Sequence, residues 1–186
     1  MSDVKILGIP GSLRKGSYNR SLVRTAQQLL PQGVTMDTFD LVGIPPFSED
    51  DEGNVPQKVI EFKAAIRRAD AILISTPEYN YSIPGVLKNA IDWASRPYGD
   101  SAWIGKPVAI MGASAGRMGT ARAQYHLRQV FVYLEMDAIN QPEVMVGNAS
   151  EMFDDKGNLT HESSRKAMRG LLEALVARTR LIRTAR

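Results

Sequence analysis

The sequence predicts an α/β protein: a doubly wound, five-stranded parallel sheet with helices on both faces. Short apolar runs recur along the 186 residues, and each is followed by a stretch with apolar residues at helical spacing. The runs at 69–77 and 106–113 are almost continuously apolar, which is typical of parallel strands buried on both faces. Strands that alternate with helices about every 30 residues predict a parallel sheet. Five strands favour the order 2-1-3-4-5, which the pattern alone does not fix.

The individual elements follow from apolar periodicity and from their boundary residues. We expect strands at 4–9, 34–41, 69–77 and 106–113, and a last short strand within 138–146. We expect helices at 21–30, 56–69, 84–95, 120–134 and 163–182. The Pro- and acid-rich segment 44–53 is a long loop, which in a compact domain is often functional or mobile. We slightly favour the other interpretation, an ordinary solvated excursion.

Composition bounds the chemistry. Hydrophobic residues make up 44% of the chain and charged residues 23%, as in a soluble globular protein, and the length predicts a single domain over 1–186. No cysteine is present, which excludes disulfides, thiol catalysis and Cys-ligated metal. Only two histidines, His126 and His161, are available, so we predict no metal centre.

Charge and targeting signals indicate the environment. The net charge of +3 is concentrated in the segment 161–186, which holds seven Lys or Arg and two Asp or Glu. That segment has no interleaved aromatic residues, and cations also suit a helix C-terminus, so we predict no nucleic-acid partner. No apolar run reaches the length of a membrane span, and the first residues lack a signal-peptide pattern. We therefore expect a cytoplasmic protein with no membrane partner.

The loop between the first strand and the first helix, residues 11–20, has the composition of an anion site. A helix start offers unpaired backbone N–H groups and the positive end of the dipole. Neutral donors and cations are added by Ser12, Ser17, Asn19, Arg14, Lys15 and Arg20. These features predict a phosphate-binding loop. The alternative is a surface loop with an ordinary N-cap, since Ser and Asn favour caps anyway.

The spacing of the glycines narrows the class of phosphate-containing ligand that the loop could bind. Gly11 and Gly16 have the separation of a Walker A loop, but Ser17 and Tyr18 stand where Lys and Ser or Thr are required. Gly8, Gly11 and Gly16 do not supply the Gly-x-Gly-x-x-Gly of a dinucleotide site. A hydroxyl-rich loop with one or two cations suits a single terminal phosphate, such as that of FMN.

Two further loops follow predicted strands at their carboxyl ends, where ligands bind in such sheets. Residues 76–84 place two tyrosines, an amide and a carboxylate between prolines, which suits a flat heteroaromatic ring. The alternative is a turn whose tyrosines cover the rim of the core. Residues 112–120 are rich in glycine, which permits close backbone approach to a ligand. We expect all three loops to meet in space.

The third loop also leaves a rival function open. Residues 112–116 spell Gly-x-Ser-x-Gly between a strand and a helix, the context of the nucleophile in α/β-hydrolases. Ser114, Asp154 and His161 even stand in the expected order. However, the chain is short for that fold, and the other two loops would have no role. We keep a serine hydrolase as a remote alternative and interpret His126 as a packing or surface residue.

Three stretches, at 11–19, 77–93 and 121–129, resemble the NADPH-dependent FMN reductase family, which contains flavodoxin-like quinone and chromate reductases. The resemblance extends over most of the chain, from residue 4 to about residue 146. It implies a flavodoxin-like fold with bound FMN. The first two stretches are specific as long strings, whereas the elbow-like third loop departs from the family around Ala115 and Arg117, so a contact from Arg117 is not implied.

The resemblance also implies which residues bind the cofactor. The residues assigned to the phosphate end of FMN are Ser12, Arg14, Ser17, Tyr18 and Asn19. The residues assigned to the isoalloxazine ring are Pro77, Glu78, Tyr79, Asn80 and Tyr81, with Ser114 and Gly116 at its far edge. No side chain is predicted to be catalytic, because FMN carries the chemistry. Candidates for shaping the open face of the ring are Tyr81, Trp93, Arg96 and the loop 45–53.

The implied activity is an oxidoreductase that works by a ping-pong cycle. Hydride passes from NADPH or NADH to FMN, and electrons then pass to a quinone, chromate or a similar small-molecule acceptor. The resemblance further implies a homodimer or homotetramer, with Arg122, Tyr125 and Glu143 as candidate subunit contacts or, equally, solvent-exposed residues. Two alternatives remain: a flavin reductase that releases reduced FMN, and a flavodoxin-type electron carrier.

Overall fold

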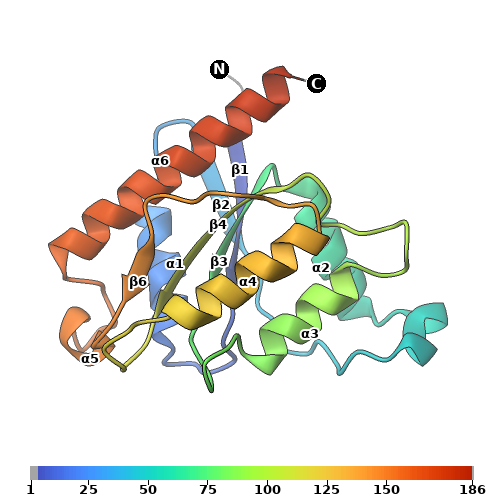
Figure 1. Cartoon of the computed structure of the whole chain (residues 1–186), viewed down its shortest axis with the longest axis horizontal. Helices are drawn as coiled ribbons and strands as arrows, with labels where there is room; N and C mark the ends of the chain where they lie inside the picture. Colours follow the sequence, from blue (N-terminus) through green and yellow to red (C-terminus); the bar gives the residue numbers. More distant parts are fainter. Residues whose placement is uncertain (1–3, 186) are drawn as a thin grey trace.

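The computed structural model describes residues 4–185, which form a parallel sheet between two layers of helices (Figure 1). The elements in chain order are β1 (Val4–Pro10), α1 (Tyr18–Gln28), β2 (Val34–Thr38), the 3-10 helix η1 (Glu49–Asn54), α2 (Gln57–Arg68), β3 (Ala71–Ser75), α3 (Gly85–Ala94), β4 (Pro107–Ala113), α4 (Ala121–Tyr133), β5 (Asp137–Ala138), β6 (Val144–Val146), α5 (Ala149–Met152) and α6 (Glu162–Thr184).

The sheet has the order β2-β1-β3-β4-β5, and its neighbouring strands are parallel. The predicted order 2-1-3-4-5 is therefore confirmed. The fifth position is shared by two short strands, since Asp137 pairs with Pro107 at the start of β4 and Val144 pairs with Met111 near its end. Pro142 lies between them and has no N–H to donate to a ladder. The single strand expected within 138–146 is thus split.

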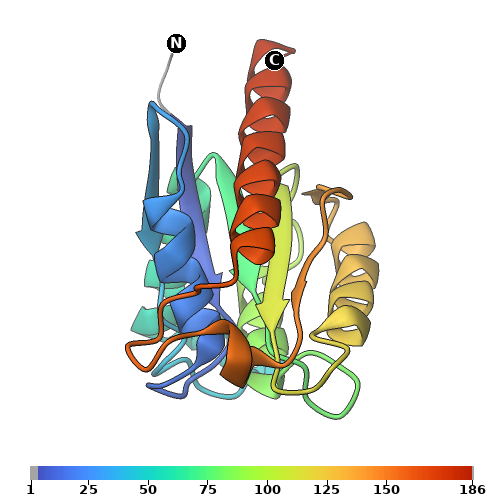
Figure 2. The ribbon, with the colours of Figure 1, turned by 90° about the vertical axis from the view of Figure 1, so that its left-hand side faces the viewer.

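Helices cover both faces of the sheet (Figures 1 and 2). One core cluster joins residues of α1 and α6 to one face, and a second joins residues of α2, α3 and α4 to the other. In β3, Leu73 belongs to the first cluster, whereas Ile72 and Ile74 belong to the second. Successive side chains of a strand point to opposite faces, so a strand buried on both faces must be apolar throughout. This explains the continuous apolar run.

The long helices lie within three residues of their predicted boundaries. The largest difference is at α1, which begins at Tyr18 because Ser17 accepts a hydrogen bond from the Asn19 amide and caps the helix. The short helices η1 and α5 were not predicted. Within the described residues, no helix is both long and apolar enough to cross a membrane.

The acidic loop before α2 is fixed on α3. The Pro45 carbonyl accepts hydrogen bonds from Asn89 Nδ2 at 2.8 Å and from Trp93 Nε1 at 2.9 Å, and the Phe47 amide donates to Asn89 Oδ1 at 2.7 Å. The segment 44–53 is therefore an anchored excursion that ends in the 3-10 helix η1.

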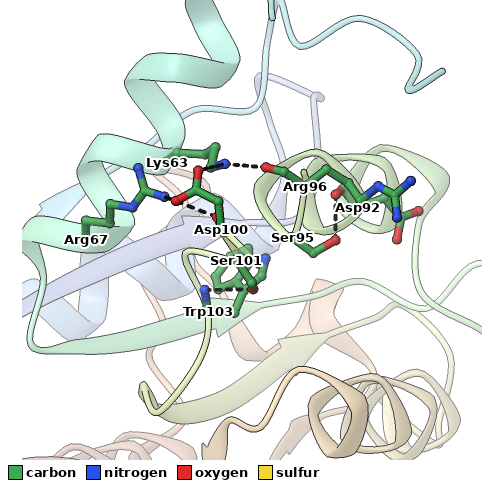
Figure 3. Close-up of polar contacts among 8 residues, drawn as sticks. All are labelled: Lys63, Arg67, Asp92, Ser95, Arg96, Asp100, Ser101 and Trp103. Atoms are coloured by element: carbon green, nitrogen blue, oxygen red, sulfur yellow. Dashed lines mark hydrogen bonds and ion pairs between the residues drawn. The ribbon is translucent and has the colours of Figure 1, made fainter. Parts of the chain in front are cut away.

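The loop after α3 is held by charged side chains of α2 (Figure 3). Lys63 Nζ donates to Asp100 Oδ2 at 2.9 Å and also to the Arg96 carbonyl, and Arg67 Nη2 donates to Asp100 Oδ1 at 2.5 Å. The Lys63 side chain is only 9% exposed, so this lysine is committed to holding the loop 95–103 in place.

Candidate functional site

The three loops singled out from the sequence lie together at the carboxyl edge of the sheet (Figure 2). They are the first loop (residues 11–17), the second loop (76–84) and the third loop (114–120). The Gly11 amide donates to the Ser75 carbonyl at 2.8 Å, and the Thr76 amide donates to the Met111 carbonyl at 2.9 Å. These bonds extend the ladders of β1, β3 and β4 into the loops, as expected from parallel neighbours.

The first loop combines buried hydroxyls with exposed cations. Ser12 and Ser17 are buried, whereas Arg14 and Lys15 are exposed. Ser12 Oγ accepts from the Arg14 amide at 3.3 Å, and the first turn of α1 contains no acidic residue. The positive end of the helix dipole is therefore not countered there, and the arrangement suits a phosphate.

Asn19 ties the first loop to the strands beside it. Its Nδ2 donates to the Ala113 carbonyl at 2.9 Å, and its Oδ1 accepts from the Ala113 amide and from Ser75 Oγ, both at 3.0 Å. The residue is 2% exposed. The side chain expected to hold phosphate thus binds the ends of β3 and β4, so its effect on a ligand is to fix the start of α1.

Arg20 is engaged away from the first loop. Its guanidinium makes a bidentate pair with Asp40, with donor–acceptor distances of 2.7 and 2.8 Å. The hydrogen bonds from Arg20 hold the pKa of Asp40 below its usual value. Of the three cations in the predicted phosphate loop, Arg14 and Lys15 are the exposed ones.

The second loop makes a tight turn that presents two tyrosines. Tyr79 and Ser82 exchange backbone hydrogen bonds of 2.9 Å, and Asn80 and Tyr81 between them have φ values of 49° and 67°. Asn tolerates this left-handed conformation, whereas for Tyr it costs about 1 kcal/mol. Tyr79 is 47% exposed and Tyr81 65%. Both rings are too exposed to cover the rim of the core.

Glu78 joins the second loop to α4. Its Oε2 accepts from the amides of Arg122 and Ala123 at 2.9 and 3.1 Å, and its Oε1 accepts from Arg122 Nη1 at 3.0 Å. Thr120, the N-cap residue of α4, makes no side-chain capping bond. Glu78 supplies that cap from 44 residues away. The sequence placed Glu78 at the site but carried no signal for this partner.

A hollow of about 470 Å³ opens between the second and third loops. The residues that line it are Glu78, Asn80, Tyr81, Ser114, Gly116, Arg117, Met118, Gly119 and Arg122. Five of them belong to the predicted ring-binding set, while Arg117, Met118, Gly119 and Arg122 do not. Close approach of the loops needs Gly112, because a Cβ there would lie 2.3 Å from the Thr76 carbonyl oxygen. We call this feature the hollow.

The chemistry of this edge fits FMN. The hollow is large enough for a flat heteroaromatic ring and has a Tyr ring and backbone groups around it. The first loop, joined to the third through Asn19 and Ala113, offers hydroxyls, cations and a helix N-terminus for one phosphate. The ring and phosphate of one molecule could therefore be held by neighbouring loops.

Two of the residues predicted to shape the open face of the isoalloxazine ring, Trp93 and Arg96, lie away from the hollow. Trp93 is 1% exposed and its indole N–H bonds the Pro45 carbonyl, so it is a core residue. Arg96 follows the C-terminus of α3, where it bonds Glu52 and Glu49 at 2.5 and 2.6 Å. Neither lines the hollow, whereas Tyr81 does.

The structure does not assemble the hydrolase triad. Ser114 Oγ accepts from the Gly116 amide, and His161 Nδ1 pairs with Ser164 Oγ at 2.9 Å. Asp154 is bonded by its own loop, and the side chain and amide of Asn158 hold its pKa below its usual value. Among residues 4–185, no hydrogen bond or ion pair joins any two of the three, so this alternative is wrong. His126 is an exposed residue that pairs with Ser82 Oγ at 3.0 Å.

A doubly wound parallel sheet of order 2-1-3-4-5, with three polar or glycine-rich loops meeting at its carboxyl edge, is the flavodoxin-like architecture. Residues 4–151 match the model of the NADPH-dependent FMN reductase family, and the chain belongs to this family. The resemblance stated from the sequence is confirmed, and with it the class of FMN-dependent NAD(P)H oxidoreductase.

Individual relatives agree with this membership. The chain is 50% identical to an NAD(P)H-dependent FMN reductase of Pseudomonas aeruginosa, over 97% of this chain and 98% of the relative. It is 44% identical to a 2-hydroxy-1,4-benzoquinone reductase of a Burkholderia species, over 94% and 95% of the two chains. Among solved structures, the flavoenzyme NAD(P)H:(acceptor) oxidoreductase FerB of Paracoccus denitrificans matches with a TM-score of 0.87 at 34% identity, over 95% of this chain and 97% of that one.

Proposed function

We propose that this chain retains FMN and uses NADPH or NADH to reduce a quinone. The observation that carries the proposal is the hollow between the second and third loops, placed next to a phosphate loop joined to it through Asn19. Bound FMN supplies the hydride and electron chemistry. The relatives of Burkholderia and Pseudomonas putida that are named as quinone reductases are 44% and 42% identical to this chain, which favours a quinone as acceptor.

The proposed roles of the residues follow their positions. The phosphate is bound at the N-terminus of α1 by Ser12, Arg14 and Ser17, with Tyr18 and Asn19 fixing that turn. The second loop and the third loop hold the two edges of the ring, through the residues Pro77, Glu78, Tyr79, Asn80, Tyr81, Ser114 and Gly116. Backbone N–H groups aimed at the ring favour negative charge on it. One face stays open to the nicotinamide and then to the acceptor.

A second acceptor, chromate, is proposed on a specific observation. The hollow has two arginines in its lining, Arg117 and Arg122. Arg117 is exposed, whereas Arg122 is paired with Glu78. A cation beside an open site attracts an anionic acceptor and raises its rate of encounter. Chromate reduction should therefore fall steeply with ionic strength, while reduction of a neutral quinone should not.

The visible spectrum tests the proposed function. The purified, desalted protein is expected to show a flavin spectrum that anaerobic NADPH bleaches and a quinone restores. A colourless protein that takes up no added FMN would overturn the proposal. Steady NADPH oxidation with quinone and no added flavin would count against a flavin-releasing reductase and against a flavodoxin-type carrier.

We also propose that the protein is a homodimer or homotetramer and is cytoplasmic. Three large residues of α4 are exposed: Tyr125 at 57%, Val132 at 80% and Tyr133 at 75%. Such a set supports a protein interface on this helix. Arg122 is a weaker candidate for a subunit contact, because it is bonded within its own chain. Light scattering should show a smaller mass for the double variant Val132→Ser, Tyr133→Ser, and an unchanged mass would count against this interface.

A further inference from the structure

Glu78 is the only acid among the residues that line the hollow. Its side chain is 10% exposed, and three N–H groups from the start of α4 and from Arg122 surround its two oxygens. A carboxylate with so little solvent is stable only if its charge is balanced. Arg122 and the N-terminus of α4 provide that balance.

Arg122 also touches the wall of the hollow. Its guanidinium carbon lies 3.9 Å from the centre of the Tyr81 ring, a cation–π geometry. Tyr81 is held in a left-handed backbone conformation, which is costly for this residue and must be maintained by its surroundings. Arg122 therefore contacts two residues, Glu78 and Tyr81, of the segment predicted to hold the ring.

We propose that Glu78 and Arg122 are positioning residues that set the reduction potential of bound FMN. The inference rests on the proposed function. The pair holds the second loop against the start of α4, and its two charges cancel each other beside the ring. An uncompensated carboxylate there would oppose the negative charge of the reduced ring, and an uncompensated guanidinium would favour it.

Opposite charge changes separate this role from a purely structural one. Glu78→Gln leaves Arg122 unbalanced, so the midpoint potential of bound FMN should rise. Arg122→Met leaves Glu78 unbalanced, so the potential should fall. Each variant loses a charge-assisted hydrogen bond, and we expect the dissociation constant of FMN to rise about tenfold. A pair that only maintained the loop would shift the potential in the same direction in both variants.

Two further variants complete the experiment. Asp92→Asn breaks the exposed pair between Lys88 and Asp92 on α3, where the distance is 2.8 Å, and should leave potential and affinity unchanged. Arg122→Lys keeps the charge without the planar fork, so its potential should stay near that of the wild type while FMN affinity falls. This variant also keeps the test open if Arg122→Met does not fold.

The outcomes are distinguishable. Opposite shifts in potential for Glu78→Gln and Arg122→Met support the inference. Shifts of the same sign, or no shift, in variants that still bind FMN would overturn it while leaving the proposed function intact. A wild-type protein that binds no FMN would instead overturn the proposed function.

Discussion

The two ends of α3 carry loops of opposite character. At its C-terminal end, Asp100 is bonded by Lys63 and Arg67 of α2 (Figure 3). At its N-terminal end, Tyr79 and Tyr81 of the second loop are exposed. Ion pairs from α2 hold the loop at the C-terminal end, whereas the second loop exposes two tyrosines and places one of them, Tyr81, in the lining of the hollow. The same helix therefore has a stabilising end and an end at which we propose that the ligand binds.

Arg96 completes the contrast. It reaches from the loop after α3 to Glu49 and Glu52 of η1, and it stacks on Tyr98 with 3.7 Å between the guanidinium carbon and the ring centre. Arg122 makes the same kinds of contact, with Glu78 and Tyr81, at the hollow. An arginine that pairs with an acid and stacks on a tyrosine is thus not a sign of a site. Arg96 also lines a hollow, of about 480 Å³, so what distinguishes Arg122 is that its hollow lies between the second and third loops.

The largest effect is expected at Asn19. This residue combines the two roles compared above, because it stabilises the fold and also fixes the loop that we propose binds the phosphate. Asn19→Ala removes three buried hydrogen bonds to Ser75 and Ala113 and should lower the free energy of unfolding by about 3 kcal/mol. It should also weaken FMN binding, since the start of α1 loses its anchor. Urea unfolding and fluorescence titration measure the two effects. Ser75→Ala, which removes one of these bonds, should cost about 1 kcal/mol. Equal stability of Asn19→Ala and the wild type would contradict the assignment.

The next largest effect is expected at the C-terminal end of α3, where it should change the free energy of unfolding and not FMN binding. Lys63→Met removes the buried ammonium that bonds Asp100 and the Arg96 carbonyl, and should lower the free energy of unfolding by about 2 kcal/mol. FMN affinity should not change. The control is Lys88→Met, which breaks an exposed pair and should cost no more than about 0.5 kcal/mol. A loss of FMN binding in Lys63→Met would show that the two ends are coupled.

A smaller effect is expected in the first loop, which lies at the same edge of the sheet as the second loop. Arg14→Ala removes an exposed cation of the first loop and should raise the dissociation constant of FMN about tenfold. Urea unfolding of the apoprotein should change by less than about 0.5 kcal/mol. Arg169→Ala, an exposed arginine of α6, serves as the control and should leave both quantities unchanged. An equal effect from the two substitutions would argue against a phosphate at the first loop.

The smallest expected effect is a loss of folding stability at low pH. Hydrogen bonds from Arg67 and Lys63 lower the pKa of Asp100 from 3.8 to about 2. Because the folded-state pKa is the lower one, the stabilisation is present above pH 3.8 and is lost as the pH falls toward 2. The Asp100 side chain is 55% exposed, so solvent screening keeps the effect modest. Asp100→Asn should be less stable than the wild type at neutral pH, and the difference should narrow in that window. A constant difference would contradict the ion pairs.

Sequence patterns predicted the doubly wound sheet and the meeting of three loops because both depend on local features. They favoured the strand order 2-1-3-4-5 without fixing it. Apolar runs at 71–75 and 107–113 must be buried on both faces, and parallel connections place the loops that follow them at one edge. The sequence did not predict that the last strand is split, although Pro142 lies between its two parts. The anchoring of the segment 44–53 depends on Asn89 and Trp93, which are more than 40 residues away.

The sequence by itself determined the fold class, the family and the identity of the loops, because periodicity and motif spacing are properties of neighbouring residues. Only the tertiary structure decided which charges are available at the site. Arg20 is paired with Asp40, and Glu78 is paired with Arg122 and caps α4. The partners in these two pairs are 20 and 44 residues apart. Side chains so distant in sequence meet only where packed strands and helices bring them together, and their pairing fixes the electrostatics that a bound ring would experience.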